Sequence, residues 1–117
     1  HMKTCPVSKV TNILGKKWTF VLLQEIVEHE GIGFNTIFKR LKKISPKVLS
    51  QRLNQLEQGE MIKKKTHTLN HQQRTTYSLT EKGEEMYKIT RGIKTWAEKY
   101  DPSLKCTTLS CTECSRY

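Results

Sequence analysis

Residues 44–59 constrain the fold of this chain more than any other stretch. Ser45 is a favoured N-cap residue, Pro46 suits the first helical position, and Gly59 is a typical C-terminal stop. The spacing therefore predicts a helix over residues 45–58. Leucines recur within it at i, i+4 and i+7, which places a single buried stripe along the helix. These leucines are Leu49, Leu53 and Leu56.

The opposite face of this helix carries only polar and basic groups. At about 100° per residue, five side chains fall together there, and none of them is a carboxylate. Amide, hydroxyl and ammonium groups hydrogen-bond to base edges and phosphates, although a solvated amphipathic helix shows the same pattern. The five residues are Lys47, Ser50, Gln51, Asn54 and Gln58.

The positive charge of the chain is concentrated around this helix. The 117 residues carry a formal net charge of +10, and residues 39–74 hold ten basic and two acidic side chains. A field of this kind favours nucleic acid as the partner. An anionic membrane fits less well, because the apolar stripe contains only leucine and is better explained as core.

The length predicts a single domain. No apolar run approaches the roughly 18 residues of a membrane span, so we expect no membrane contact and a cytoplasmic protein. His1 before Met2 resembles a cloning remnant, and residues 1–4 are expected to form a tag or N-terminal arm.

Three helices are expected before the central one. The first begins at Cys5-Pro6 and stops near Gly15, and the second runs over residues 17–28 with a mostly buried apolar face. The third covers residues 34–41, and we expect a loop rather than a strand before it. The buried residues predicted for the second helix are Trp18, Val21, Leu22, Leu23 and Ile26.

A β-hairpin and a long helix are expected after Gly59. Residues 63–68 and 74–79 have strand character, and the polar residues 70–73 between them form the turn. Thr80 can cap a final helix that reaches about Tyr100. Its apolar residues repeat in steps of three and four and have little domain left to cover them, which favours a dimer seam. They are Met86, Ile89, Ile93, Trp96 and Tyr100.

This order of elements is that of a winged helix-turn-helix: mainly α, with a small β-hairpin and a long C-terminal dimerisation helix. The sequence also resembles the HxlR-type family of winged helix-turn-helix transcription regulators, relatives of the MarR group. The resemblance covers residues 5 to about 100. It rests on residues 5–7 (CPV), 15–19 (GKKWT), 34–35 (FN), 44–53 (ISPKVLSQRL) and 77–83 (YSLTEKG).

The resemblance implies a homodimer that binds a palindromic operator in double-stranded DNA as a repressor or activator. It places the helix over residues 45–58 in the major groove and the wing over residues 63–79 on the backbone or in the minor groove. The DNA-binding domain then spans residues 5–100, and residues 101–117 form a cysteine-containing tail. The expected DNA-contacting residues are Ser45, Lys47, Ser50, Gln51, Asn54, Arg52, Lys43, Lys65, His67, His71 and Arg74. For Arg52 a phosphate contact and a structural role both stay open.

The four cysteines allow several interpretations. Cys106, Cys111 and Cys114 are spaced C-x4-C-x2-C, and with Cys5 they would complete a four-sulfur set for a metal ion or an Fe–S cluster. A thiol redox switch and the absence of any function are the alternatives. Cys5 is the best redox-sensing candidate, because it precedes a helix N-terminus, where the dipole favours the thiolate. A buried, inert thiol remains the other reading.

Two function classes follow. The first is a DNA-binding transcription regulator. The alternative is a metal- or cluster-bearing redox protein that uses the cysteines, with a basic face that docks an acidic partner. We expect no enzyme, because the chain has no credible Ser-His-Asp set, Gly-rich phosphate loop or HExxH motif.

Overall fold

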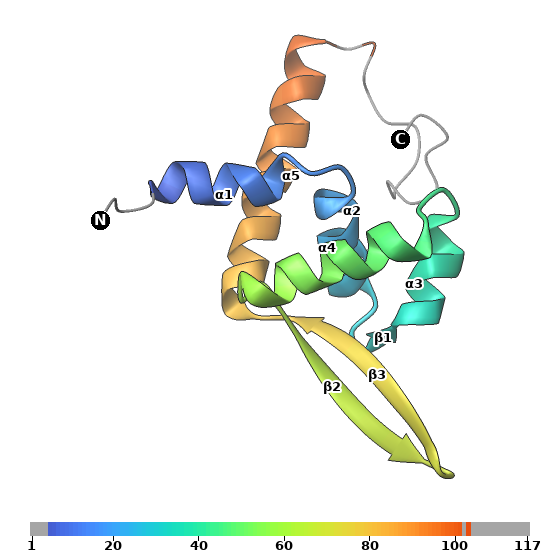
Figure 1. Ribbon diagram of the computed structural model, residues 1–117. Coiled ribbons are helices and arrows are strands. Elements are labelled where there is room, and N and C mark those ends of the chain that lie inside the picture. The colour runs from blue at the N-terminus through green and yellow to red at the C-terminus, as the bar shows by residue number, and fades with distance from the viewer. Residues whose placement is uncertain (1–4, 102, 104–117) are drawn as a thin grey trace.

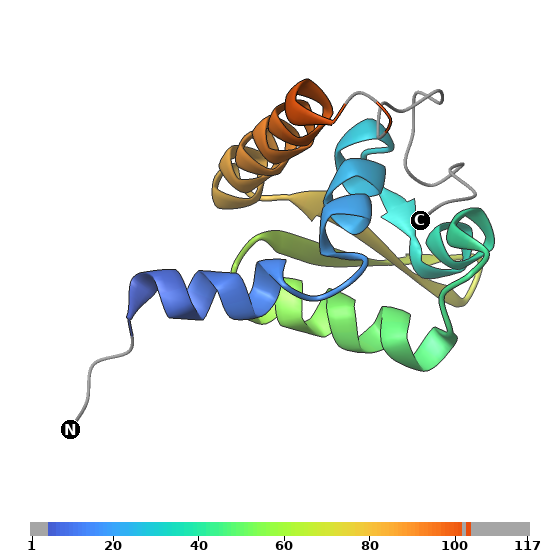
Figure 2. The ribbon, with the colours of Figure 1, turned by 90° about the horizontal axis from the view of Figure 1, so that it is seen from above.

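The computed structural model describes residues 5–101 and residue 103, and it forms the predicted winged helix-turn-helix (Figures 1 and 2). The elements in chain order are α1 (Pro6–Leu14), α2 (Thr19–Glu28), β1 (Ile32–Gly33), α3 (Phe34–Leu41), α4 (Pro46–Gln58), β2 (Ile62–Leu69), β3 (Gln72–Leu79) and α5 (Glu81–Tyr100). Among these elements, no helix combines the length and the apolar composition that crossing a lipid bilayer requires.

Helix α4 forms as its local sequence dictates. The Ser45 hydroxyl accepts a hydrogen bond from the backbone N–H of Val48 at 3.1 Å, and Pro46 occupies the first turn. At the other end, the Gly59 N–H donates to the Gln55 carbonyl. The leucine stripe is buried: Leu49, Leu53 and Leu56 are 0%, 3% and 1% exposed.

The core lies around α2, which is covered by the other elements (Figure 2). The buried residues predicted for this segment are all buried, as expected. The helix begins at Thr19 rather than at Lys17, because Trp18 has a left-handed backbone with φ of 83° and cannot join the first turn. The polar Thr19 is buried too, and its hydroxyl donates to the Ile13 carbonyl at 2.9 Å.

The expectation of a loop before α3 is wrong. Ile32 and Gly33 form the short strand β1, which pairs antiparallel with Tyr77 and Thr76 of β3 and completes a three-stranded sheet in the order β1-β3-β2. The Gly31 N–H extends this pairing by donating to the Tyr77 carbonyl at 3.2 Å. A two-residue strand has no room for an alternating side-chain pattern, so its backbone pairing leaves no periodic signal in the sequence.

The hairpin is longer and its turn tighter than expected. Only Asn70 and His71 form the turn, with φ angles of 52° and 65°, the arrangement that suits a two-residue hairpin loop. Gln72 and Gln73, expected in the turn, instead pair with Leu69 and Thr68. The strands therefore project as a ribbon beyond the helical body (Figure 1).

Helix α5 is anchored at its beginning and exposed at its end. The Thr80 hydroxyl accepts from the Gly83 N–H at 3.0 Å, and Gly83 lies against the backbone of Met61. Stacking of Phe20 on Tyr87, with ring centroids 6.0 Å apart, holds this end of the helix on α2. Met86, expected in the dimer seam, instead packs against the core. The later turns stand clear of the domain (Figure 1).

Candidate nucleic-acid interface

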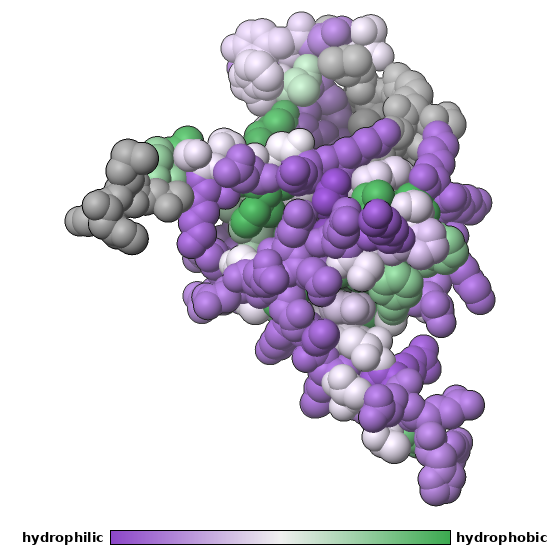
Figure 3. Space-filling view, viewed as in Figure 1, coloured by the Kyte–Doolittle hydropathy of each residue, from purple (hydrophilic) through white to green (hydrophobic). Residues whose placement is uncertain are grey.

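The outward face of α4 is polar over its whole length. Lys47, Ser50, Gln51 and Asn54 are all exposed, as is Gln58 at the last position of the helix. They lie on the side opposite the leucine stripe, which packs on the core. Figure 3 shows this part of the surface as strongly hydrophilic and continuous with the hairpin. The structure therefore presents together the side chains that the helical spacing placed on one face.

Ser45 and Arg52, two further predicted contact residues, already have partners within the chain. The Ser45 side chain caps α4, as described above. Arg52 is half-buried, and its guanidinium donates to the Lys17 carbonyl at 3.4 Å and to the Gln55 side-chain oxygen at 3.3 Å. The first bond ties α4 to the segment before α2, and the second lies within α4, so the geometry favours the structural role over the phosphate contact for Arg52.

Lys43 lies in the short turn between α3 and α4, and its side chain is exposed. Lys42, beside it, has a positive φ of 59°, which lets the chain reverse direction within a few residues. The turn thus places Lys43 near the N-terminal end of α4, which is the end that carries Lys47.

The hairpin gathers its basic side chains on one face of the ribbon. His67 pairs in register with Arg74, and Lys65 pairs with Thr76, so these side chains point to the same side. All of the candidates on the hairpin are exposed, including His71 in the turn. Lys64 points to the other side and reaches the Glu57 carboxylate at 3.7 Å, which ties β2 to α4.

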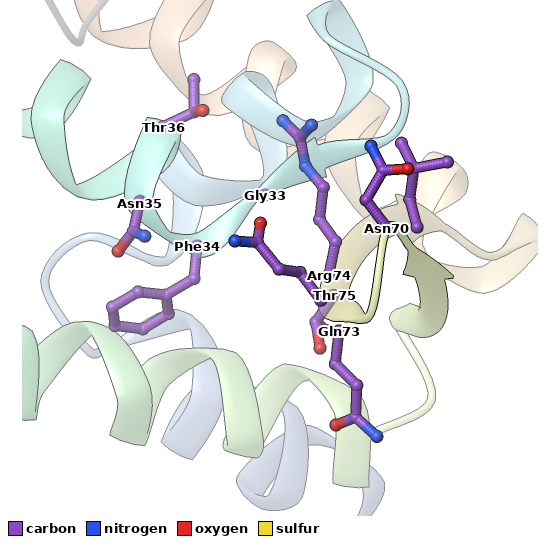
Figure 4. Close-up of a pocket in the computed structure, with 10 residues that line it drawn as sticks. Gly33, Phe34, Asn35, Thr36, Asn70, Gln73, Arg74 and Thr75 are labelled. Carbon is purple, nitrogen blue, oxygen red and sulfur yellow. The ribbon is translucent and has the colours of Figure 1, made fainter.

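A hollow of about 510 Å³ separates the hairpin from the beginning of α3 (Figure 4). Gly33, Asn35 and Thr36 line one side, and Gln73 and Arg74 line the other. The first turn of a helix presents backbone N–H groups and partial positive charge. Sequence reasoning missed Asn35, Thr36 and Gln73, since only the fold brings this turn beside a strand about 40 residues later.

At the root of the hairpin, Tyr77 marks the change from exposed ribbon to packed core. Burial, together with the nearby Glu57 carboxylate, raises the pKa of Tyr77 above its ordinary value of 10.0. The tyrosine therefore stays neutral and packs against the core cluster.

The cysteines are only partly described by the structure. Cys5 is exposed and its thiol is free, at the N-cap position of α1, which excludes the buried thiol considered from the sequence. Cys106, Cys111 and Cys114 lie outside the described residues. Helix α1 projects from the body (Figures 1 and 2) and buries none of its residues fully.

Comparison with known proteins decides the family. The model of the HxlR-like helix-turn-helix family matches residues 13–105. This chain belongs to that family. The HTH-type transcriptional regulator YdeP of Bacillus subtilis is 31% identical over 82% of this chain and 73% of its own.

Two solved structures of this type share the fold and are similar in sequence. The reduced form of the transcriptional regulator YodB from B. subtilis has a TM-score of 0.73 and 26% identity, covering 85% of this chain and 96% of its own. The redox regulator HypR in its oxidized form has a TM-score of 0.68 and 27% identity over 81% of this chain and 96% of its own. The HxlR-type protein is thus a helix-turn-helix transcriptional regulator, and its relatives are regulators rather than enzymes.

Proposed function

We propose that this protein is a homodimeric, sequence-specific DNA-binding regulator that lays α4 in the major groove and the hairpin along the backbone or minor groove. The observation that carries the proposal is the exposed face of α4, which bears no carboxylate and adjoins the basic hairpin. Such a face suits the acceptor-rich edges of bases and the phosphates beside them.

The chemistry of the exposed side chains assigns them different roles. Gln51 and Asn54 are suited to the paired donor and acceptor of adenine, and Lys47 to guanine or a phosphate. Ser50 and Ser45 are the remaining contact candidates on the N-terminal half of the helix, and their hydroxyl groups can hydrogen-bond to a base edge or a phosphate. Phosphate contacts fall to side chains around α4 and on the ribbon, and these are Lys43, Lys65, His67, His71 and Arg74.

The exposed seam on α5 supports the dimer. Ile89, Ile93, Trp96 and Tyr100 are each more than half exposed, although they share one side of the helix. Large apolar side chains gathered in this way mark an association surface. Two copies related by a two-fold axis would present their α4 helices to half-sites about one helical turn apart, roughly 34 Å. A palindromic operator follows from that symmetry.

Cys5 gives this regulator a route to thiol sensing. Its thiol is exposed at the start of α1, and two solved structures that resemble the chain are a reduced regulator and a redox regulator. An accessible thiol can be oxidised and restored. The alternative function, a metal- or cluster-bearing redox protein, depends on three cysteines outside the described residues, so no structural observation favours it.

The first experiment measures fluorescence anisotropy on DNA from upstream of the protein's own gene and on scrambled DNA. We expect Asn54→Ala to weaken binding to the preferred sequence by about 1–3 kcal/mol and to scrambled DNA very little, because Asn54 reads a base. Gln58→Ala, on the same face but at the far end of α4, is the matched control and should bind like the wild type. If Asn54→Ala lost the same affinity on both DNAs, the result would contradict the placement of α4 in the major groove.

The same assay separates phosphate contacts from base contacts and tests the thiol. Lys65→Ala should weaken binding to both DNAs alike and reduce the salt slope by about 1. A mild thiol oxidant should change the affinity of the wild type but not that of Cys5→Ser. An identical oxidant response in Cys5→Ser would retire Cys5 as the sensor while leaving the DNA-binding proposal intact.

A further inference from the structure

The C-terminal end of α2 carries a cluster of side chains of the types that bind metal ions, and none of them is among the proposed DNA contacts. Glu25, Glu28 and His29 occupy positions i, i+3 and i+4, so they lie on one side of the helix. Each offers one ligand atom, and these three atoms lie within 4.8 Å of one another. The His29 Nε2 is 3.9 Å from the Glu25 Oε1. One imidazole and two carboxylates thus lie close together.

The Glu25 carboxylate is the unusual member of this cluster. Its side chain is 0% exposed, and its Oε1 accepts a hydrogen bond from the Nε of Arg40 on α3. Among the residues that the structure describes, none forms a hydrogen bond with its buried Oε2. A buried carboxylate oxygen without a partner is costly, because water no longer solvates its share of the charge.

The other two members of the cluster, Glu28 and His29, lie at the surface. Glu28 accepts a hydrogen bond from the Gln24 side-chain amide at 3.3 Å, which orients its carboxylate along the helix. His29 is the C-cap residue of α2, and its side chain is 44% exposed. The cluster therefore has one buried metal ligand and two accessible ones, so an ion can enter from solvent.

We propose that Glu25, Glu28 and His29 form a binding site for a divalent transition-metal ion of the Zn²⁺ type. Imidazole and carboxylate together suit Zn²⁺, which accepts three protein ligands and completes its coordination with water. The ion adds positive charge beside the buried carboxylate, which Arg40 also contacts. Arg40 then acts as the outer partner that orients this ligand, as groups hydrogen-bonded to metal ligands do.

The position of the site gives the ion a structural consequence. The C-terminal end of a helix carries partial negative charge, which favours a cation there. The His29 carbonyl accepts from the Ile32 N–H at 3.0 Å, so the metal-ligating residue also holds the start of β1. Through β1 the ion stiffens the root of the hairpin, and through Arg40 it stiffens the junction of α2 with α3.

Isothermal titration of the metal-free, full-length protein with ZnCl₂ tests the site. The titration is run on the wild type and on a variant with all four cysteines changed to serine, which removes thiolate sites. We expect both proteins to bind one ion per chain at the cluster. Loss of all zinc binding in the serine variant would assign the zinc to the cysteines and overturn the proposal.

Matched pairs of variants in the serine background locate the ion. His29→Ala and Glu28→Gln should each weaken zinc binding by about tenfold or more, the scale expected for damage to a metal site. His71→Ala and Glu30→Gln are the matched controls. His71 is an exposed histidine far from the cluster in the sequence, and Glu30 is the exposed acid next to His29. Both control variants should bind zinc as tightly as the serine variant from which they are made. Both cluster residues are accessible, so folding is preserved, and circular dichroism verifies it. Equal affinity in all four variants would overturn the site.

Discussion

Helices α4 and α5 carry similar apolar stripes, but the fold buries the stripe on α4 and leaves the stripe on α5 exposed. On α4, Leu49, Leu53 and Leu56 are at most 3% exposed. On α5, Ile93 and Trp96 are 55% and 64% exposed although they repeat with the same helical spacing. One stripe lies against the core around α2, and the other lies on the later turns of α5, a part of the helix that extends away from the rest of the domain (Figure 1).

The contrast shows what a hydrophobic period does and does not determine. The period predicts a helix and the side of that helix that avoids water, because it depends only on the 3.6-residue turn. What covers that side depends on where the chain places its other elements. The stripe on α4 is therefore a stability feature of the domain, and the stripe on α5 is the surface that we propose for assembly.

The largest effect is expected on α4. Leu53→Ala should lower the free energy of unfolding by about 2–5 kcal/mol, because it leaves a cavity in packed core. Ile93→Ala removes a similar volume from α5 and should leave the unfolding of the isolated subunit nearly unchanged. Urea denaturation at low protein concentration measures both. Equal losses in the two variants would mean that the two stripes do not differ.

Gly83 tests the buried beginning of α5. A Cβ at this position would lie 1.9 Å from the Met61 carbonyl oxygen, so the backbone must move to admit one. We expect Gly83→Ala to destabilise the domain by about 3 kcal/mol, the upper end of what overpacking costs, despite the better helix propensity of alanine. Thermal unfolding monitored by circular dichroism checks this, and an unchanged midpoint would contradict the packing of α5 on the Met61 backbone.

Trp96 tests the assembly role of the exposed seam. Trp96→Ala should weaken dimerisation by about 2 kcal/mol or more, as truncation of a central aromatic residue does in protein interfaces. Sedimentation velocity over a concentration series measures the shift toward monomer. Thr95→Ala, which changes an exposed neighbour on another side of α5, is the control. If the wild-type chain stayed monomeric at all concentrations, the result would contradict the proposed dimer.

The smallest effect is expected at the second glycine of α5. A Cβ at Gly92 meets nothing within 4 Å, so alanine fits without strain. Gly92→Ala should raise the unfolding free energy by roughly 0.5–1 kcal/mol, because alanine loses less backbone freedom in a helix. Measuring it in the Trp96→Ala background separates this gain from any change in assembly. A loss of stability there would show that the late turns of α5 are packed after all.

Local interactions account for most of what could be predicted. The caps at Ser45 and Thr80 and the leucine stripe of α4 each depend on residues within about two helical turns. The exposed face of α4 follows from the same periodicity. The predicted helices and hairpin are therefore present, and the candidate contact residues on α4 and the hairpin lie at the surface, apart from the half-buried Arg52.

Apart from the exact ends of α2 and of the hairpin turn, the features that were missed join segments far apart in the chain. Strand β1 exists because Ile32 meets Tyr77, and the hollow beside Asn35 exists because α3 begins next to β3. The buried Glu25 is explained by Arg40, fifteen residues away. None of these contacts has a repeating signature, since backbone pairing and single side-chain bonds can form between almost any suitable residues.

The amino-acid order alone thus determines the helices and the two hairpin strands, which side of each helix is apolar, and where the positive charge gathers. These properties arise from hydrogen bonds and spacing within a few residues. Only the tertiary structure decides that the stripe on α4 is covered and the one on α5 is not, and that Glu25 is buried beside His29. Burial is a property of what lies nearby in space, and the contacts that create it close loops of tens of residues.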